Sequence, residues 1–143
     1  MSKLGDRIAM SLPVDVKYIS VARLAIAGAA ARADLSIEAT EDLKIAVSEA
    51  CTNVIEHAFG DDPAAGDHRI KLTFYVADKE LTIEVEDEGC GFDPKHLPPV
   101  ADKPFAEGTG LGLYLMGEMM DEIKIESAPG SGTKIMMTKR SAR

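Results

Sequence analysis

The stretch EDLKIAVSEACTN, Glu41 to Asn53, sets the pattern from which the rest of the chain can be interpreted. At about 3.6 residues per turn, its apolar residues fall on one side of a helix and its acidic and amide residues on another. Ser36 or Thr40 can open this helix, which we expect to continue to about Phe59, before Gly60. The apolar stripe consists of Leu43, Val47, Ala50, Val54 and Ala58, and the polar stripe of Asp42, Glu49, Asn53 and Glu56.

The sequence on either side predicts a sheet for this helix to cover. Asp15 can cap an alanine-rich helix that runs to about Ala33, and a third helix is expected from Gly110 to Met120. Apolar and polar residues alternate in the expected strands, which are Arg7–Leu12, Arg69–Val76, Leu81–Val85, Glu122–Ser127 and Thr133–Thr138. Alternation is typical of a sheet with one covered face. We therefore expect a two-layer α/β sandwich, with a mixed, mostly antiparallel sheet covered on one face by helices, in a single domain over residues 1–143.

Composition excludes several classes of function. The chain has 143 residues and a net charge of −8, which argues against binding to nucleic acid because phosphate needs a basic surface. No run of about 18 apolar residues predicts a membrane span, and Met1 to Arg7 lacks the apolar core of a signal peptide. Cys51 and Cys90 are interpreted as reduced thiols, as expected in the cytoplasm.

Glu49 and Asn53 are the first candidates for chemistry. Residues four apart lie side by side on a helix. An amide oxygen is a neutral ligand that suits Mg²⁺, and a carboxylate can take a proton from an attacking hydroxyl group. The alternative is a polar helix face that is only solvated.

Asp87 is the second candidate. It continues the every-second-residue pattern of Leu81, Ile83 and Val85, so we expect it to face the core. A carboxylate in that position must be satisfied by a partner. An adenine amino group is a suitable donor, whereas a simple turn at the strand end explains the following glycines but not the inward acid. Thr133 shares parity with Ile135 and Met137 and also faces inward, or is an ordinary strand threonine.

A second glycine-rich segment, Gly108 to Gly112, precedes the expected third helix. Glycines allow close approach of the backbone, and the amides at a helix N-terminus bind phosphate. A flexible helix cap is the alternative interpretation.

Three motifs, in their order along the chain, resemble the N box and the two glycine boxes of the GHKL ATPases. They are Glu49-x-x-x-Asn53, Asp87-x-Gly89-x-Gly91 and Gly108-x-Gly110-x-Gly112. Two longer stretches are similar to signatures of anti-sigma factor serine-protein kinases, particularly of the sigma-B type. These are EDLKIAVSEACTN and GLGLYLM, Gly110 to Met116.

The resemblance implies roles for individual residues. It makes Glu49 the general base, Asn53 the Mg²⁺ ligand and Asp87 the acid that recognises the adenine of ATP, with Thr133 behind Asp87. The nucleotide pocket and lid would further include Gly89, Gly91, Gly108, Thr109, Gly110, Leu111 and Gly112. An arginine near the γ-phosphate is a feature of some relatives. Phe92 to Thr109 has none, and Lys103 is the candidate to replace it as a point charge.

The resemblance also implies partners. The expected protein binds a sigma factor, phosphorylates a serine of an anti-sigma factor antagonist and forms a homodimer. Arg23, which has Val16, Ile19, Ile26 and Ala27 as helical neighbours, corresponds to a partner-contacting arginine, and a snorkelling or internally paired arginine is the alternative. Two other functions stay open, which are a switch kinase that acts on a scaffold protein and a sequestering module that does not transfer phosphate.

Overall fold

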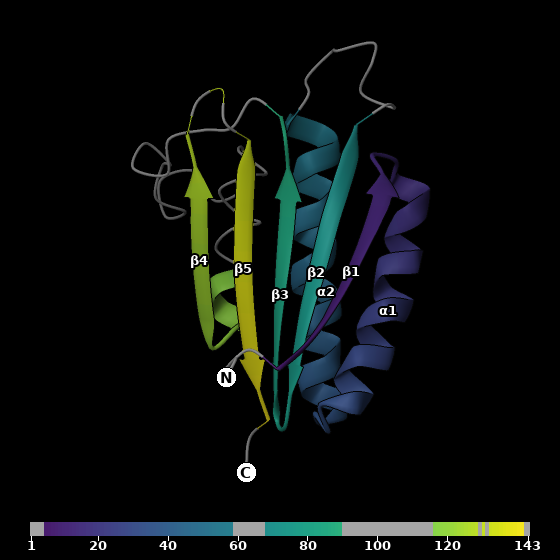
Figure 1. Cartoon of the computed structure of the whole chain (residues 1–143), viewed down its shortest axis with the longest axis vertical. Coiled ribbons are helices and arrows are strands. Elements are labelled where there is room, and N and C mark those ends of the chain that lie inside the picture. Colours follow the sequence, from purple (N-terminus) through teal and green to yellow (C-terminus); the bar gives the residue numbers. More distant parts are fainter. Residues whose placement is uncertain (1–4, 59–67, 90–115, 129, 131, 142–143) are drawn as a thin grey trace.

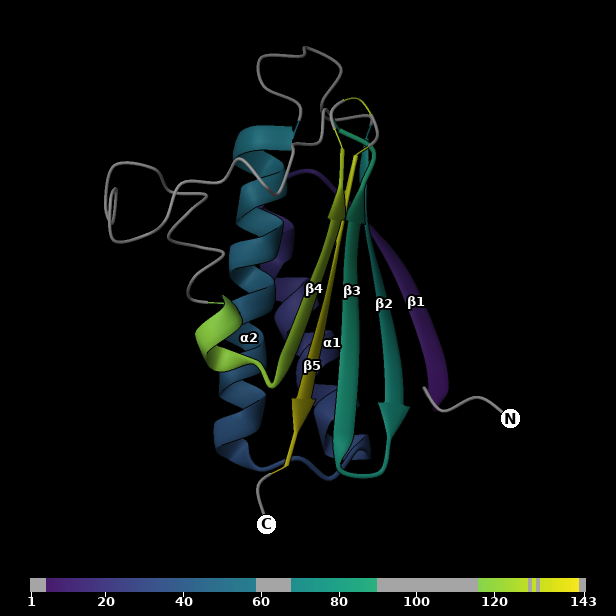
Figure 2. The same ribbon diagram turned by 90° about the vertical axis from the view of Figure 1, so that its left-hand side faces the viewer.

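The computed structural model describes residues 5–58, 68–89, 116–128, 130 and 132–141. They form two layers, a five-stranded sheet and the helices that cover one of its faces (Figures 1 and 2). The strands are β1 (Asp6–Pro13), β2 (Arg69–Ala77), β3 (Glu80–Asp87), β4 (Glu122–Ser127) and β5 (Thr133–Arg140). The expected two-layer sandwich is confirmed.

The strands lie in the order β1-β2-β3-β5-β4, and every pair among the described strands is antiparallel. The parallel pairing that a mixed sheet would need therefore does not occur among these strands. β5 inserts between β3 and β4, and this insertion brings the end of β3 next to the start of β5. The expected strand boundaries are confirmed to within one or two residues, and the pairing of β3 extends to Asp87.

Side-chain caps fix where the helices begin. Asp15 accepts a hydrogen bond from the Lys17 amide and starts a 3-10 turn (Val16–Tyr18), which leads into α1 (Ile19–Arg32). Of the two expected starts for the second helix, Ser36 is the cap, since its Oγ accepts from the Ala39 amide at 3.1 Å. This helix, α2 (Ile37–Asn53), continues as a π-helical turn η2 (Val54–Ala58). A helical segment at 116–119 lies within the third expected helix.

The two-residue turn at Asp78-Lys79 joins β2 to β3 and is tied to the end of α1. Lys79 has φ +65° and forms an ion pair with Asp34, which has φ +60° at the end of α1. The Lys79 amide also donates to the carbonyl oxygen of Ala33 at 2.8 Å. Both residues adopt the left-handed conformation that is uncommon outside glycine, and their contact fixes the hairpin against the helix.

The core lies between the helices and the covered face of the sheet. Its largest fully buried side chains include Phe74 from β2, Ile83 from β3, Ile26 from α1 and Leu43 from α2. The stripe of Leu43, Val47, Ala50 and Val54 that the sequence predicts is buried. Cys51 is a free, buried thiol, and burial raises its pKa to about 12, so it is protonated and unreactive at neutral pH.

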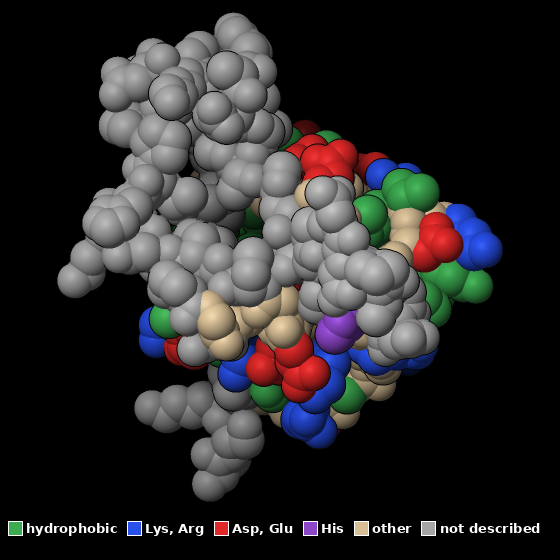
Figure 3. Space-filling view, turned by 90° about the horizontal axis from the view of Figure 1, so that it is seen from above, with side chains coloured by type: hydrophobic (Ala, Val, Ile, Leu, Met, Phe, Trp, Pro, Cys, Tyr) green, Lys and Arg blue, Asp and Glu red, His purple; other side chains and the backbone are tan. Residues whose placement is uncertain are grey.

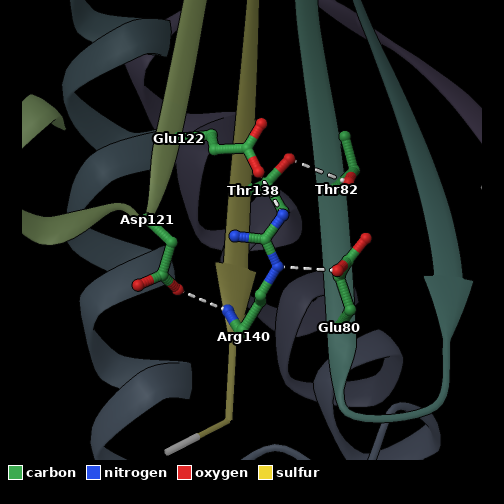
Figure 4. Close-up of polar contacts among 6 residues, drawn as sticks. All are labelled: Glu80, Thr82, Asp121, Glu122, Thr138 and Arg140. Carbon is green, nitrogen blue, oxygen red and sulfur yellow. Dashed lines mark hydrogen bonds and ion pairs between the residues drawn. The ribbon is translucent and has the colours of Figure 1, made fainter.

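Polar contacts hold the last residues of β5 to both neighbouring strands at the end where β3 begins (Figure 4). Arg140 pairs with Glu80 on β3 and Glu122 on β4, and its amide donates to the Asp121 carboxylate at 2.6 Å. Deeper in the sheet, Thr82 and Thr138 share a hydrogen bond of 3.0 Å. These contacts lie at the end of the sheet opposite the candidate site described next.

Candidate functional site

Asp87 is the last residue of β3 and is only 5% exposed, so the predicted inward orientation is confirmed. Its Oδ1 accepts a hydrogen bond of 2.7 Å from the amide of Gly89, two residues later. Burial raises the pKa of the carboxyl group, the Gly89 amide partly offsets this rise, and the charge of Glu86 adds to it. The carboxylate is therefore held in an environment that disfavours its charge and favours a hydrogen-bond donor beside it.

Thr133 lies directly opposite Asp87 across the β3–β5 pair, and Ser127 lies directly opposite Thr133 across the β5–β4 pair. Residues opposite one another share a face of the sheet, so the three side chains form a row on the covered face. Ser127 Oγ donates to the Gly132 carbonyl oxygen at 3.0 Å and lies 2.8 Å from Thr133 Oγ1. Because the serine proton is used in this way, the threonine hydroxyl donates to Ser127 and keeps its oxygen as an acceptor.

Gly132 completes the row through its backbone. It has φ +75°, and a Cβ on this residue would lie 2.3 Å from the carbonyl oxygen of Asp87. Only glycine fits both the conformation and the space. The sequence placed Gly132 in a turn, and neither its contact with Asp87 nor the role of Ser127 was predicted. The parity of Ser127 with Ile125 and Ile123 is the signal that could have identified the serine.

A cavity of about 350 Å³ opens beside this row. It is lined by Asp87, Ser127, Gly132 and Thr133, and by Glu86, Glu126 and Lys134. Because the last three side chains alternate with the first group along the strands and lie on the other face, the cavity is at the ends of the strands. Figure 3 looks down on this end of the molecule, where acidic and neutral polar groups lie side by side. The convergent polar groups suit a small ligand with a hydrogen-bonding edge.

Glu49 and Asn53 lie at the same end of the molecule. The direction of α2 follows from the ion pair of 3.1 Å between Asp42, near its start, and Lys139, near the end of β5. From Asp42 to Asn53, α2 rises by about 16 Å, and from Lys139 back to Thr133, β5 spans about 20 Å. The end of α2 therefore reaches the level of Thr133 and Asp87, and Figures 1 and 2 show it beside the end of β3 and the start of β5.

Both side chains are half-buried at this end of α2. The α-helix changes to a π-helical turn directly after Asn53. Such turns occur frequently at functional sites. The described residues bring Asn53 and Asp87 to one end of the sandwich from two different layers.

Arg23 lies away from this row, on the exposed side of α1. Its Nε donates to Ser48 Oγ on α2 at 2.9 Å. The apolar stripe predicted around it is divided, because Ile19 and Ile26 are buried in the core whereas Val16 is exposed.

The other predicted site residues lie outside the described parts of the chain. They are Gly91, Lys103, Gly108, Thr109, Gly110, Leu111 and Gly112. No group of three His, Cys, Asp or Glu side chains that could hold a metal by itself occurs in the described residues. The amide oxygen of Asn53 is of a kind that suits Mg²⁺, which usually takes several of its ligands from a bound molecule and from water. Among the described helices, none is long and apolar enough to cross a membrane.

Comparison with known proteins gives a consistent result. The family described as the histidine kinase-like ATPase domain matches residues 12–139. The serine-protein kinase RsbW of Bacillus velezensis is 38% identical over 147 residues, which cover 97% of this chain and 88% of that protein. The RsbW of Listeria monocytogenes serotype 4a is 37% identical, with 97% of this chain and 90% of that protein covered.

The solved structures agree on the fold. The crystal structure of the RsbU and RsbW domains of a Mycobacterium tuberculosis protein is similar with a TM-score of 0.69 and 19% identity. The similarity covers 96% of this chain, which spans 33% of that longer chain. At this level of identity, the comparison supports the fold alone.

Proposed function

This chain belongs to the histidine kinase-like ATPase family, and from that premise we propose that it is a serine-protein kinase that also acts as an anti-sigma factor. Relatives named serine-protein kinase RsbW match it over almost its whole length. The structural observation that carries the proposal is the buried acid at the end of β3, at the same end of the sandwich as the last turns of α2, which carry Glu49 and Asn53 (Figure 1). In this arrangement, Asp87 would accept a hydrogen bond from the adenine base, Asn53 would bind Mg²⁺ and Glu49 would take a proton.

Asp87 would read the adenine of ATP. Its Oδ1 is used by the Gly89 amide, which leaves Oδ2 to accept from the adenine amino group. Thr133 keeps an acceptor oxygen next to it, and both residues line the cavity at the strand ends. The raised pKa of Asp87 supports this role, because a hydrogen bond from a ligand relieves the cost of the buried charge.

Glu49 would act as the general base, and Asn53 would hold Mg²⁺ through its amide oxygen. ATP would supply the phosphoryl group, with its charge neutralised by Mg²⁺. Transfer of a phosphoryl group requires mainly positioning and neutralisation of charge. The carboxylate of Glu49 would take the proton from the attacking serine hydroxyl, and it lies one helical turn from Asn53.

We assign the remaining glycine-rich positions to the same nucleotide. Gly89 holds the Asp87 carboxylate, and Gly91 continues that motif. Backbone amides in the second glycine segment would hold the phosphates, with Lys103 as the nearby cation. The residues of this second segment are Gly108, Thr109, Gly110, Leu111 and Gly112.

The protein partners would be a sigma factor and an anti-sigma factor antagonist that carries the phosphorylated serine. Phosphoserine brings nearly two negative charges, and this protein has a net charge of −8. Phosphorylation should therefore repel the antagonist and allow the sigma factor to bind again. We propose that Arg23 contacts these partners. We also propose that the protein acts in the cytoplasm.

We also propose that the protein is a homodimer. The resemblance to the sigma-B-type kinases supports this proposal, and the sheet has a face without a described helix that could meet a second copy. Along one row of this face the charges alternate across neighbouring strands, through Lys71, Glu86, Lys134 and Glu126. Light scattering of the purified protein would give twice the monomer mass, and a single monomer mass at micromolar concentration would contradict the proposal.

One experiment separates this function from its alternatives. The tagged protein is incubated with native cell extract, and bound proteins are identified by mass spectrometry and then purified. Each is mixed with the kinase and radiolabelled ATP. We expect to recover a sigma factor that is not labelled and a second protein, the antagonist, that is labelled on serine. A labelled scaffold without a sigma factor would favour the switch kinase, and binding without labelling would favour a sequestering module.

A further inference from the structure

Arg23 and Ser48 connect the two helices that cover the sheet. The Nε atom of Arg23 on α1 donates to Ser48 Oγ on α2 over 2.9 Å. Arg23 is exposed, and Ser48 is half-buried and directly precedes Glu49. The hydrogen bond therefore joins a surface arginine to the helix that carries the proposed general base.

This hydrogen bond uses only one part of the guanidinium group. Arginine presents its N–H groups in a rigid planar fork, so fixing Nε also fixes the direction of the two terminal nitrogens. Within the described residues, these terminal nitrogens form no hydrogen bond or ion pair. A surface cation that is oriented but not neutralised is prepared to meet an acceptor on another molecule.

Exposed aliphatic side chains occur on both helices that this hydrogen bond joins. Val16, two turns before Arg23, is 66% exposed, and Leu24 is 74% exposed. On the other helix, Ile45 lies one turn before Ser48 and is 44% exposed. Arginine is among the residue types that are enriched at binding hot spots, where the contacts around it exclude water.

We propose that Ser48 is a positioning residue that orders Arg23 for the protein partner. This inference rests on the partner role given to Arg23 under the proposed function. A free arginine must lose rotamer freedom when it is bound, and the Ser48 hydroxyl removes part of that loss before the partner arrives. Ser48 thus acts through Arg23 and does not itself have to touch the partner.

The test measures the affinity for each of the two partners recovered from the cell extract, the sigma factor and the antagonist, after purification. We expect Ser48→Ala to weaken binding about 2- to 10-fold, which corresponds to ordering one long side chain. Ser48→Thr keeps the hydroxyl group and should bind like the wild type. In the Arg23→Ala background, Ser48→Ala should have no further effect, because the group that it orders is gone. Nucleotide affinity should not change in Ser48→Ala.

A second measurement uses the protein without its partner. The NMR signal of the Arg23 Nε–H group should exchange with solvent faster in Ser48→Ala than in the wild type and in Ser48→Thr. Equal exchange rates would overturn the inference. So would wild-type binding by Ser48→Ala when Arg23→Ala binds weakly, or additive effects of the two substitutions. If Arg23→Ala binds like the wild type, the partner role of Arg23 fails together with this inference, whereas labelling of the antagonist tests the kinase function separately.

Discussion

The backbone of Gly132 lies against the carbonyl oxygen of Asp87, in a space where a Cβ would be only 2.3 Å from that oxygen. Gly132 also has φ +75°, which glycine adopts without strain. The turn before β5 can therefore approach the end of β3, and this approach brings Thr133 opposite Asp87. The shape of the candidate site depends on this contact between two backbones.

We predict that Gly132→Ala lowers both the stability and the nucleotide affinity of the protein. The left-handed conformation costs roughly 1–2 kcal/mol for alanine, and the contact with Asp87 must widen in addition. A total loss of roughly 2–4 kcal/mol in the free energy of unfolding is expected, measured by urea denaturation. Titration with ATP should show weaker binding, because Asp87 moves with its carbonyl group.

Two other glycines provide matched controls. Gly130 has φ +81° but open space around its Cβ position, so Gly130→Ala should show the cost of the conformation alone. Gly28 lies in α1 with open space and ordinary φ, so Gly28→Ala should stabilise the protein by about 0.5–1 kcal/mol. If Gly132→Ala costs no more than Gly130→Ala, the contact with Asp87 has no energetic consequence.

Asp87→Asn should change how stability depends on pH. Burial raises the pKa of Asp87 above its ordinary value of 3.8, so the folded protein holds a proton that the unfolded chain has already released. The contribution of Asp87 to the stability of the wild type is therefore greatest at low pH, below the pKa values of both the folded and the unfolded state. It falls as the pH rises through these two values. Asparagine does not titrate, so the variant does not lose stability in this way. Its stability relative to the wild type should rise across the window just above pH 3.8 and then stay constant. Urea denaturation at several pH values measures this difference, and a flat difference would contradict the shifted pKa.

The same variant tests the recognition of adenine. An asparagine can turn its amide nitrogen toward the adenine amino group, which places two donors together. Affinity for ATP should fall, and discrimination against GTP should weaken. The asparagine oxygen can still accept the hydrogen bond from the Gly89 amide, so the fold should persist. Unchanged ATP affinity together with continued exclusion of GTP would make Asp87 a structural residue.

Glu49→Ala should abolish transfer of phosphate and leave ATP binding largely intact. A general base contributes roughly 10²–10⁴-fold to a rate, and the proposal gives Glu49 no part in holding the nucleotide. Labelling of the purified antagonist measures the first effect, and titration with ATP measures the second. Glu41→Ala is a suitable control, because Glu41 lies on the same helix and forms an exposed pair with Lys44. Equal losses of ATP affinity and labelling rate in Glu49→Ala would refute the assigned role.

Most of the fold could be predicted because local patterns decide it. Alternation in β2 and β3 and the two-residue turn between them were sufficient for the hairpin, and the apolar stripe of α2 identified its buried face. Parity also predicted the inward direction of Asp87, since pleating alternates side chains strictly. The order of the strands could not be obtained in this way, because the insertion of β5 between β3 and β4 depends on contacts between distant segments.

The candidate site was predicted only in part. Its side chains follow from motif and parity, but the contact of Gly132 with Asp87 is a meeting of two backbones that no residue pattern records. Similarly, the hydrogen bond between Arg23 and Ser48 depends on how α1 and α2 pack together. The sequence left open whether Arg23 is paired internally or faces a partner, and the structure shows that one side of the guanidinium group is paired.

Lys139 provides the last prediction, because it joins three elements at the end of the core. Its Nζ lies 3.1 Å from the carboxylate of Asp42 on α2 and donates to the carbonyl oxygen of Met119 at 2.6 Å. The side chain is only 16% exposed, so both contacts are largely shielded from water. Lys139→Met preserves the apolar stem but leaves the carbonyl oxygen and the carboxylate without this donor, which should cost roughly 1–3 kcal/mol. Lys124→Met, at an exposed position on β4, should change stability by less than about 0.5 kcal/mol. Urea denaturation of both variants measures the difference, and equal stabilities would show that water replaces the lysine at no cost.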